Sequence, residues 1–273
     1  MEKTIGYAQF LPVLGEVRKN LAFIERLAAE AVGADLLVFP ELATSGYDFK
    51  DRAEAGRYAE VFGEGATSAL ALRLAAVHGM TIVIGYPERA GDRQYNACLM
   101  ALPDGSLHNY RKIHLFSRET LLFDPGDALP PVIETPAGRV GLMICFDWVF
   151  PETARVLALG GAQIIAHPSN LVLPWCQRAM YCRCVENRVY AVTANRVGTE
   201  THAGRTLTFT GASQVVSPTG EYLVQAPVDG EHVGVARVDV SKADNKAITE
   251  YNALWADRRT DLYGDLVVPV VAR

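Results

Sequence analysis

The sequence lacks the features that mark membrane, exported and nucleic-acid-binding chains. None of its apolar runs is long enough to cross a bilayer, and the N-terminal MEKTIGYAQF has no long apolar core of a secretion signal. The chain also lacks a basic tract, and its formal net charge of -5 is mild and spread along its length. These absences argue against a membrane or a nucleic acid as the partner.

Cysteine and histidine are too few and too scattered to build a disulfide framework or a metal site. The 5 cysteines are Cys98, Cys145, Cys176, Cys182 and Cys184. An odd, uneven set in a chain of this length indicates a reducing cytoplasm. Cys182 and Cys184 lie two apart on a predicted helix, where they point to different faces, and the 6 histidines show no paired ligand spacing. We therefore expect neither a metal nor another cofactor.

The chain does contain enough apolar sequence for a large core. Hydrophobic residues make up 49% of its 273 residues and charged residues 21%, and no linker, repeat or low-complexity segment divides it. We therefore expect residues 1–273 to form a single domain. Helical stripes alternate with β-prone runs, and turn sequences at 103–105 and 218–220 each separate two such runs. This mixture predicts sheets that include antiparallel pairs and are covered by helices.

The chain is organised around residues 140–152, VGLMICFDWVFPE. The apolar run over 140–144 is typical of a buried strand, and Pro151 followed by Glu152 is typical of the first turn of a helix. Cys145 is thus predicted in a tight turn, where it faces backbone N–H groups and the positive end of the helix. Such surroundings would lower the pKa of the thiol. The alternative is a buried structural cysteine.

Two more reactive side chains are predicted at the ends of other strands. Glu41 follows a buried strand predicted over residues 36–39, and Lys112 ends a strand predicted over 107–111. The carboxyl ends of strands are where α/β proteins usually place ligands and catalytic groups. Taken singly, Glu41 could be a helix cap or an ion-pair member, and Lys112 a solvated strand end.

The sequence around these three residues resembles the nitrilase (carbon–nitrogen hydrolase) superfamily. The matching motifs are FPELATSGY at residues 39–47, YRKIHLF at 110–116 and ICFDWVFPE at 144–152. Supporting matches are ETLLFDPG at 119–126, HPSNL at 167–171 and RAMYCRCVENRVY at 178–190. The resemblance covers essentially the full chain, and three separately spaced motifs in the right order make it specific. It implies an α/β fold, the four-layer α-β-β-α sandwich of the nitrilase type.

The resemblance also implies roles for four residues. Cys145 would be the nucleophile, Glu41 the general base, and Lys112 the group that stabilises the tetrahedral intermediate. Glu119 would be a second glutamate that holds the substrate and Lys112 in place. This chemistry is consistent, because a thiol is a poor nucleophile until a base takes its proton, and that base can pass the proton to leaving ammonia.

Six further residues near the nucleophile are predicted to contact the substrate. Asn170 follows a predicted strand end beside the site, and its backbone or side-chain amide would contact the substrate nitrogen. For the aromatic members the alternative is core packing, which for Trp175 weighs as much as pocket lining. The six are Tyr47, Phe116, Phe146, Trp148, Asn170 and Trp175.

The residues after the cysteine bear on the substrate class. True nitrilases generally carry Trp-Glu directly after the cysteine, whereas here Phe146 and Asp147 stand there, which disfavours nitriles. Relatives that bind a substrate carboxylate place arginine shortly after the cysteine, where this chain has Trp148 and Val149. An apolar pair favours a neutral substrate, unless an arginine from elsewhere reaches the site. The candidates are Arg178, Arg183 and Arg188.

The predicted function is hydrolysis of small, neutral aliphatic amides to carboxylic acid and ammonia through a cysteine thioester. The alternative within the superfamily is an N-carbamoyl amino acid or ω-amide hydrolase. A catalytically silent binding scaffold is disfavoured by the intact Glu41, Lys112 and Cys145, and thiol labelling would distinguish it. A redox-sensing thiol would need a resolving cysteine near Cys145, which mass spectrometry after mild peroxide would detect.

The C-terminal segment predicts self-association. Residues 257–273 read as an extended tail, and an exposed apolar run at 266–271 is unfavourable on a monomer. The resemblance implies pairing through helices beside the cysteine and through the tails, here residues 151–159, 177–187 and 257–273. We expect a homodimer or higher homo-oligomer with two-fold symmetry.

Overall fold

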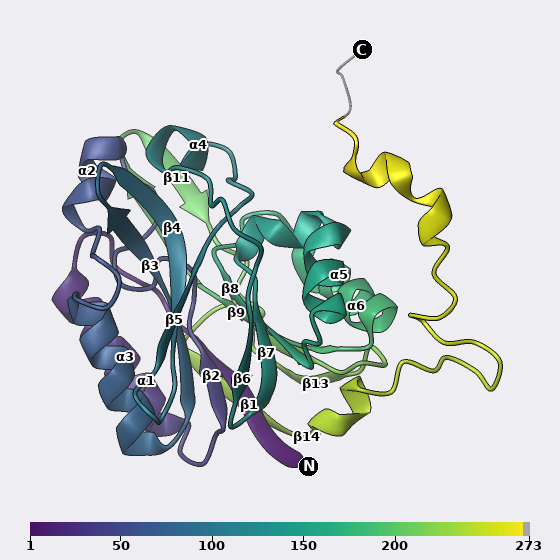
Figure 1. Ribbon diagram of the computed structural model, residues 1–273. Coiled ribbons are helices and arrows are strands. Elements are labelled where there is room, and N and C mark those ends of the chain that lie inside the picture. Colours follow the sequence, from purple (N-terminus) through teal and green to yellow (C-terminus); the bar gives the residue numbers. More distant parts are fainter. Residues whose placement is uncertain (270–273) are drawn as a thin grey trace.

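Two six-stranded sheets stack face to face in the computed structural model, which describes residues 1–269 (Figure 1). The first sheet has the order β14 (His232–Asp239), β1 (Glu2–Gln9), β2 (Leu36–Val38), β3 (Thr81–Ala90), β4 (Arg93–Ala101), β5 (Leu107–Arg111). The second has the order β13 (Tyr222–Gln225), β12 (Gln214–Val216), β9 (Tyr190–Asn195), β8 (Ile164–Ser169), β7 (Gly138–Leu142), β6 (Val132–Thr135). In each sheet three parallel strands, β1–β3 or β7–β9, are flanked by antiparallel ones.

Helices cover the outer face of each sheet. The first sheet is covered by α1 (Val17–Glu30) and α3 (Ala66–His78), and the second by α5 (Pro151–Leu159) and α6 (Cys176–Asn187) (Figure 1). Each helix turns a buried stripe to its sheet; in α1 the stripe includes Ile24, Leu27 and Ala28, spaced three and four residues apart. The layers are therefore α-β-β-α, and the predicted sandwich is confirmed.

Apolar side chains fill the space between the two sheets. Met100 and Tyr110 on the first sheet belong to one buried cluster with Leu142 and Ile164 on the second. Removing this surface from water is the main favourable term holding the layers together, at roughly 25 cal/mol per Å². The central strand β2 is buried along its whole length, which explains why its sequence is a continuous apolar run.

Glu41, Lys112 and Cys145 lie just past the carboxyl ends of strands. Glu41 is three residues beyond β2, Cys145 is three residues beyond β7, and Lys112 directly follows β5. The backbone of β3 passes so close to this edge that a Cβ on Gly85 would lie 2.5 Å from the Glu41 Cα. Glycine is therefore required at position 85, because a side chain there would push Glu41 out of place.

The structure also contains elements that the sequence did not predict. The short helix α2 (Arg52–Arg57) and the hairpin of β10 (Thr199–His202) and β11 (Arg205–Thr208) were not expected. Between residues 113 and 126 the chain forms the short helix α4 (Glu119–Leu122). The strand predicted over 140–144 instead ends at Leu142, because the chain turns into a 3-10 turn (Cys145–Val149). The predicted helix start at Pro151 is confirmed.

The C-terminal segment leaves the sandwich. After a 3-10 turn (Val240–Ala243), the chain runs outward and carries two more such turns, Thr260–Leu262 and Gly264–Val267 (Figure 1, yellow). Leu266 and Val267 on this segment are 66% and 86% exposed. The end of the apolar run predicted at 266–271 lies outside the described residues. Within residues 1–269, no helix combines the length and apolar character needed to cross a membrane.

Candidate active site

Glu41, Lys112 and Glu119 meet in one buried ion cluster. The Lys112 Nζ donates to Glu41 Oε1 at 2.6 Å and to both carboxylate oxygens of Glu119, at 2.9 and 2.7 Å. Asn96 Nδ2 also donates to Glu41 Oε1, at 2.7 Å, and the Tyr47 hydroxyl donates to Glu119 Oε1 at 2.6 Å. These side chains come from β4, from the segments that directly follow β2 and β5, and from the start of α4, so the first sheet and its connections build the cluster.

The second carboxylate oxygen of Glu41 is the open position of this cluster. Oε2 is buried and accepts no hydrogen bond from any described residue. Burial raises the pKa of Glu41; Lys112 opposes this rise and the nearby Glu119 adds to it. A buried carboxylate with a raised pKa and a free oxygen has the properties of a proton acceptor.

Lys112 stays charged in this cluster. Burial on its own would lower the pKa of Lys112, but the carboxylates of Glu119 and Glu41 outweigh burial and raise it above its ordinary value. The cluster therefore pairs one positive group with two negative groups. A buried charge without such partners would carry a large desolvation cost.

Cys145 lies at the start of the 3-10 turn in a strained backbone conformation. Its φ of 39° falls in the left-handed region, which costs a non-glycine residue about 1–3 kcal/mol. Hydrogen bonds hold the chain before and after its Cα: Ile144 N donates to Asp147 Oδ2 at 2.9 Å, and His167 Nε2 donates to the Cys145 carbonyl at 3.0 Å. Such over-determined strain is typical of a nucleophile that is presented at a fixed angle.

The prediction that the turn lowers the pKa of Cys145 is wrong in direction. Burial raises the pKa of this thiol well above its ordinary value, and Glu41 raises it further, while Lys112 and the Asn170 backbone work the other way. The cause is tertiary, because α5 begins only at Pro151 while the sulfur sits in a dry site beside a carboxylate. At neutral pH the resting thiol therefore keeps its proton.

Cys145 opens onto a small, largely apolar cavity. Its volume is about 10 Å³, close to the space of one water molecule. Four of the predicted substrate-binding residues line it with Cys145; none of its lining side chains carries a charge. The lining residues are Phe116, Cys145, Phe146, Trp148, Asn170, Leu171, Val172 and Leu173.

Two of the predicted substrate-binding residues lie elsewhere. Tyr47 bonds to Glu119 rather than lining the cavity. Trp175 precedes α6 and is 60% exposed, so neither pocket lining nor core packing describes it. The reason is the helix register, because the next residue, Cys176, turns to the core and is fully buried.

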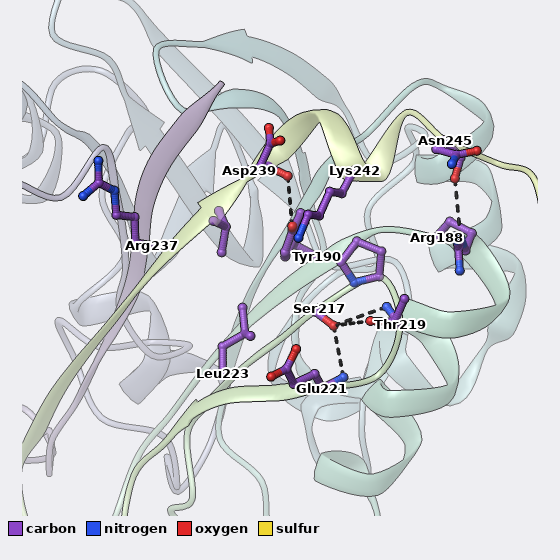
Figure 2. A pocket seen from close by; sticks show the side chains of 12 residues that line it. Arg188, Tyr190, Ser217, Thr219, Glu221, Leu223, Arg237, Asp239, Lys242 and Asn245 are labelled. Atoms are coloured by element: carbon purple, nitrogen blue, oxygen red, sulfur yellow. Dashed lines mark hydrogen bonds between the residues drawn. The ribbon is translucent and has the colours of Figure 1, made fainter.

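The arginines that were candidates for a carboxylate clamp point to other partners. Arg183 Nε donates to the Trp148 carbonyl at 3.1 Å, and Arg183 Nη1 pairs with Glu186 at 2.9 Å. Arg188 lies beside Asn245 at a second cavity of about 250 Å³, which shares no lining residue with the Cys145 cavity (Figure 2). Arg178 is exposed on α6.

Three supporting residues escaped the sequence analysis. Asn96, Asp147 and His167 are fully buried and polar, and each bonds to Glu41 or to the Cys145 turn. The available signal was a polar side chain inside an apolar strand, as at Asn96 within QYNACLMA. Among residues 1–269, no three His, Cys, Asp or Glu side chains gather in a group that could hold a metal ion.

Comparison with known proteins gives the family. A model of the carbon-nitrogen hydrolase family matches residues 4–247, and the chain belongs to this family. It is 45% identical over 261 residues to a nitrilase of Pyrococcus abyssi (95% of this chain, 98% of that one) and 32% identical over 272 residues to the N-carbamoylputrescine amidase of Arabidopsis thaliana (91% and 90%). A solved amidase of Nesterenkonia sp. AN1 in complex with butyramide is similar in fold, with a TM-score of 0.80, 25% identity and 96% of each chain covered. The chain is thus a carbon–nitrogen hydrolase of the nitrilase superfamily.

His167 generates a prediction about pH and stability. Burial lowers its pKa from 6.5 to about 4, so the folded protein keeps it neutral where the unfolded chain binds a proton. The free energy of unfolding should therefore fall as pH drops from about 6.5 toward 4, by up to about 1.4 kcal/mol per pH unit from this residue.

Urea unfolding at a series of pH values checks this prediction. His167→Gln removes the titrating group but keeps a donor for the Cys145 carbonyl, so its stability should fall less steeply over the same range. Equal slopes for the two proteins would contradict the assignment of a neutral His167.

Proposed function

We propose that this carbon–nitrogen hydrolase cleaves small, neutral aliphatic amides to a carboxylic acid and ammonia. The observation that carries the proposal is the buried cluster of Glu41, Lys112 and Glu119 beside Cys145, at a cavity without a charged lining residue. The cluster supplies a base and a positive charge, and Cys145 supplies the nucleophile; these are the groups that acyl transfer from an amide requires.

The first step is attack of Cys145 Sγ on the amide carbonyl carbon. Because the thiol is protonated at rest, Glu41 Oε2 takes its proton as the carbon–sulfur bond forms. The carbonyl electrons move to oxygen, where the positive charge of Lys112 and the N–H of Phe146 stabilise the oxyanion. A contact of this kind is typically worth about 3–4 kcal/mol.

The intermediate then collapses to a thioester. Glu41 passes its proton to the nitrogen, the carbon–nitrogen bond breaks, and ammonia leaves. Glu41, again a carboxylate, takes a proton from water as that water attacks the thioester. As the carbon–sulfur bond breaks, the acid is released and Glu41 returns its proton to sulfur, which restores the Cys145 thiol and the Glu41 carboxylate. Glu119 holds Lys112 in place throughout, because it accepts two of the contacts of Nζ.

Asn170 is placed to hold the substrate nitrogen. Its Nδ2 donates to the Glu41 carbonyl at 2.8 Å, while its Oδ1 is buried and has no partner among the described residues. Asn170 lines the cavity, so the amide N–H of a substrate would satisfy this oxygen.

The lining supports a substrate without a carboxylate. Trp148 lines the cavity at a position where carboxylate-binding relatives place arginine, and Val149 packs against the core. The other arginine candidates are exposed, paired or at the second cavity. A carboxylate in this cavity would lose its hydration without gaining a partner, a penalty of several kcal/mol.

The mechanism predicts that Cys145→Ala abolishes ammonia release and that Glu41→Gln and Lys112→Met are nearly as damaging. Substitutions of residues that act as a unit do not have additive effects on activity. A variant that combines two of these substitutions should therefore be little less active than either single variant. Ammonia release from propionamide measures this. Cys182→Ala, at an exposed cysteine of α6, is the matched control and should keep activity. Wild-type turnover by Cys145→Ala would overturn the mechanism.

The proposed substrate class predicts a ratio of kcat/KM values between neutral and carboxylated amides. The kcat/KM for propionamide should exceed that for α-ketoglutaramate or an N-carbamoyl amino acid by about 100-fold or more, since each 1.36 kcal/mol in the barrier is about a factor of ten. Trp148→Arg should narrow this ratio by supplying a bidentate partner, whereas Trp148→Leu should not. A wild-type ratio near or below one would replace the proposed function with the N-carbamoyl or ω-amide alternative.

We also propose that residues 1–273 act as a single domain in the cytoplasm and assemble at least as a homodimer. Support for assembly comes from the exposed apolar side chains of the C-terminal segment, Leu266 and Val267 among them. Trp255 anchors the base of this segment between Arg155 of α5 and Lys246, at 5.2 and 5.3 Å from its ring.

Light scattering checks the prediction that the protein is at least a homodimer. A monomer at micromolar concentration would contradict it.

A further inference from the structure

Asp147 joins the two halves of the candidate active site. It is fully buried in the 3-10 turn, two residues after Cys145. Its Oδ2 accepts from the Ile144 N–H at 2.9 Å and from the Tyr110 hydroxyl at 2.8 Å. Its Oδ1 accepts from the His114 N–H at 3.2 Å and from His114 Nδ1 at 2.8 Å.

The four donors come from two different sheets. Ile144 lies in the turn after β7 of the second sheet, directly before Cys145. Tyr110 lies on β5 of the first sheet, two residues before Lys112, and His114 lies two residues after it. One carboxylate therefore binds the chain on both sides of Lys112 and also binds the N–H of Ile144, the residue before Cys145.

These contacts act directly on the position of the Lys112 side chain. Tyr110 and Lys112 are two residues apart on an extended chain, so their side chains point to the same face. The Lys112 N–H continues the strand ladder by donating to the Asn96 carbonyl at 2.8 Å, and both side chains are buried. A displacement of Tyr110 would therefore be passed to the Lys112 ammonium.

We propose that Asp147 is a positioning residue that sets Lys112 relative to Cys145 across the two sheets. This inference rests on the proposed roles of those two residues. The need for such a residue is physical, because the base and the ammonium belong to the first sheet while the nucleophile belongs to the second. A misplacement of about 1 Å between reacting groups can cost on the order of 100-fold in rate.

A second cross-sheet contact shows that the arrangement is not confined to Asp147. Asn170, which follows β8 of the second sheet, donates to the carbonyl of Glu41 on the first. Asn170 thus fixes the position of Glu41, and Asp147 fixes the position of Lys112. Both positions are fixed relative to the second sheet, which carries Cys145. The two contacts are independent, because they share no residue.

The test separates positioning from stability by comparing two tyrosines. Tyr110→Phe removes one hydrogen bond to Asp147 without removing volume. Tyr190→Phe is the matched control, because Tyr190 is equally buried at 3% exposure and its hydroxyl donates to the Asp239 carbonyl at 2.9 Å, outside the Cys145 cavity. Asp147→Ala is unsuited, since it leaves four donors without their acceptor and is expected to unfold the turn. Asp147→Asn, which keeps one acceptor oxygen, is the second variant.

The site variants are expected to lower kcat, whereas the control variant is expected to lower only thermal stability. Tyr110→Phe and Asp147→Asn should lower kcat for propionamide by about tenfold or more with KM changed by less than about threefold. Tyr190→Phe should lose a comparable amount of thermal stability with kcat unchanged. The double variant Tyr110→Phe with Asp147→Asn should be less damaging than the product of the single effects, because both act through one carboxylate.

A readout that does not depend on turnover completes the test. The positive charge of Lys112 lowers the pKa of the Cys145 thiol, so a displaced Lys112 should slow alkylation of Cys145 by iodoacetamide in both site variants but not in Tyr190→Phe. Mass spectrometry of the Cys145 peptide measures the rate. If wild-type protein releases no ammonia from any amide, the proposed function fails, and the alkylation rates still decide the positioning role. Equal kcat and equal alkylation rates in Tyr110→Phe and Tyr190→Phe would reduce Asp147 to a structural residue.

Discussion

The structure depends on one buried interaction, the ammonium of Lys112 held between the carboxylates of Glu41 and Glu119. All three groups are removed from water, and the desolvation of each costs several kcal/mol unless its partners are well placed. Tyr47 and Asn96 supply further donors to the two carboxylates, so the cluster is close to saturated. Of the four carboxylate oxygens of Glu41 and Glu119, Glu41 Oε2 is the one without a partner among the described residues, which makes it the proposed proton acceptor.

This cluster explains why the site needs two stacked sheets. One sheet could carry the three charged residues, but its exposed face would leave them in water, where the charges are screened and the pKa values return toward their ordinary range. The second sheet covers them and brings in Cys145 on a separate turn. Because the covered site combines residues from both sheets, the two sheets must keep a fixed position relative to each other. Asn170 and Asp147 make contacts between them.

The sequence predicted those parts of the site that depend on neighbours along the chain. Apolar runs located the strands before Glu41 and Cys145, and the Pro151 signal located α5, because burial and helix capping act over a few residues. The direction of the Cys145 pKa shift could not be predicted, since it depends on burial and on Glu41, about a hundred residues away in the chain. The β10–β11 hairpin was missed because it is polar and partly exposed, so it leaves no apolar alternation.

The raised pKa values of Glu41 and Cys145 have a consequence for the order of events. A thiolate formed in advance would be a buried anion that has lost its hydration, with the Glu119 carboxylate nearby, and both effects disfavour it. Proton transfer from sulfur to Glu41 is therefore expected together with carbon–sulfur bond formation rather than before it. The resting cluster of two carboxylates and one ammonium also carries a net negative charge. An anionic substrate would meet this repulsion as well as the lack of a partner in the cavity, so the charge of the buried cluster supports the proposed preference for neutral amides together with the apolar lining.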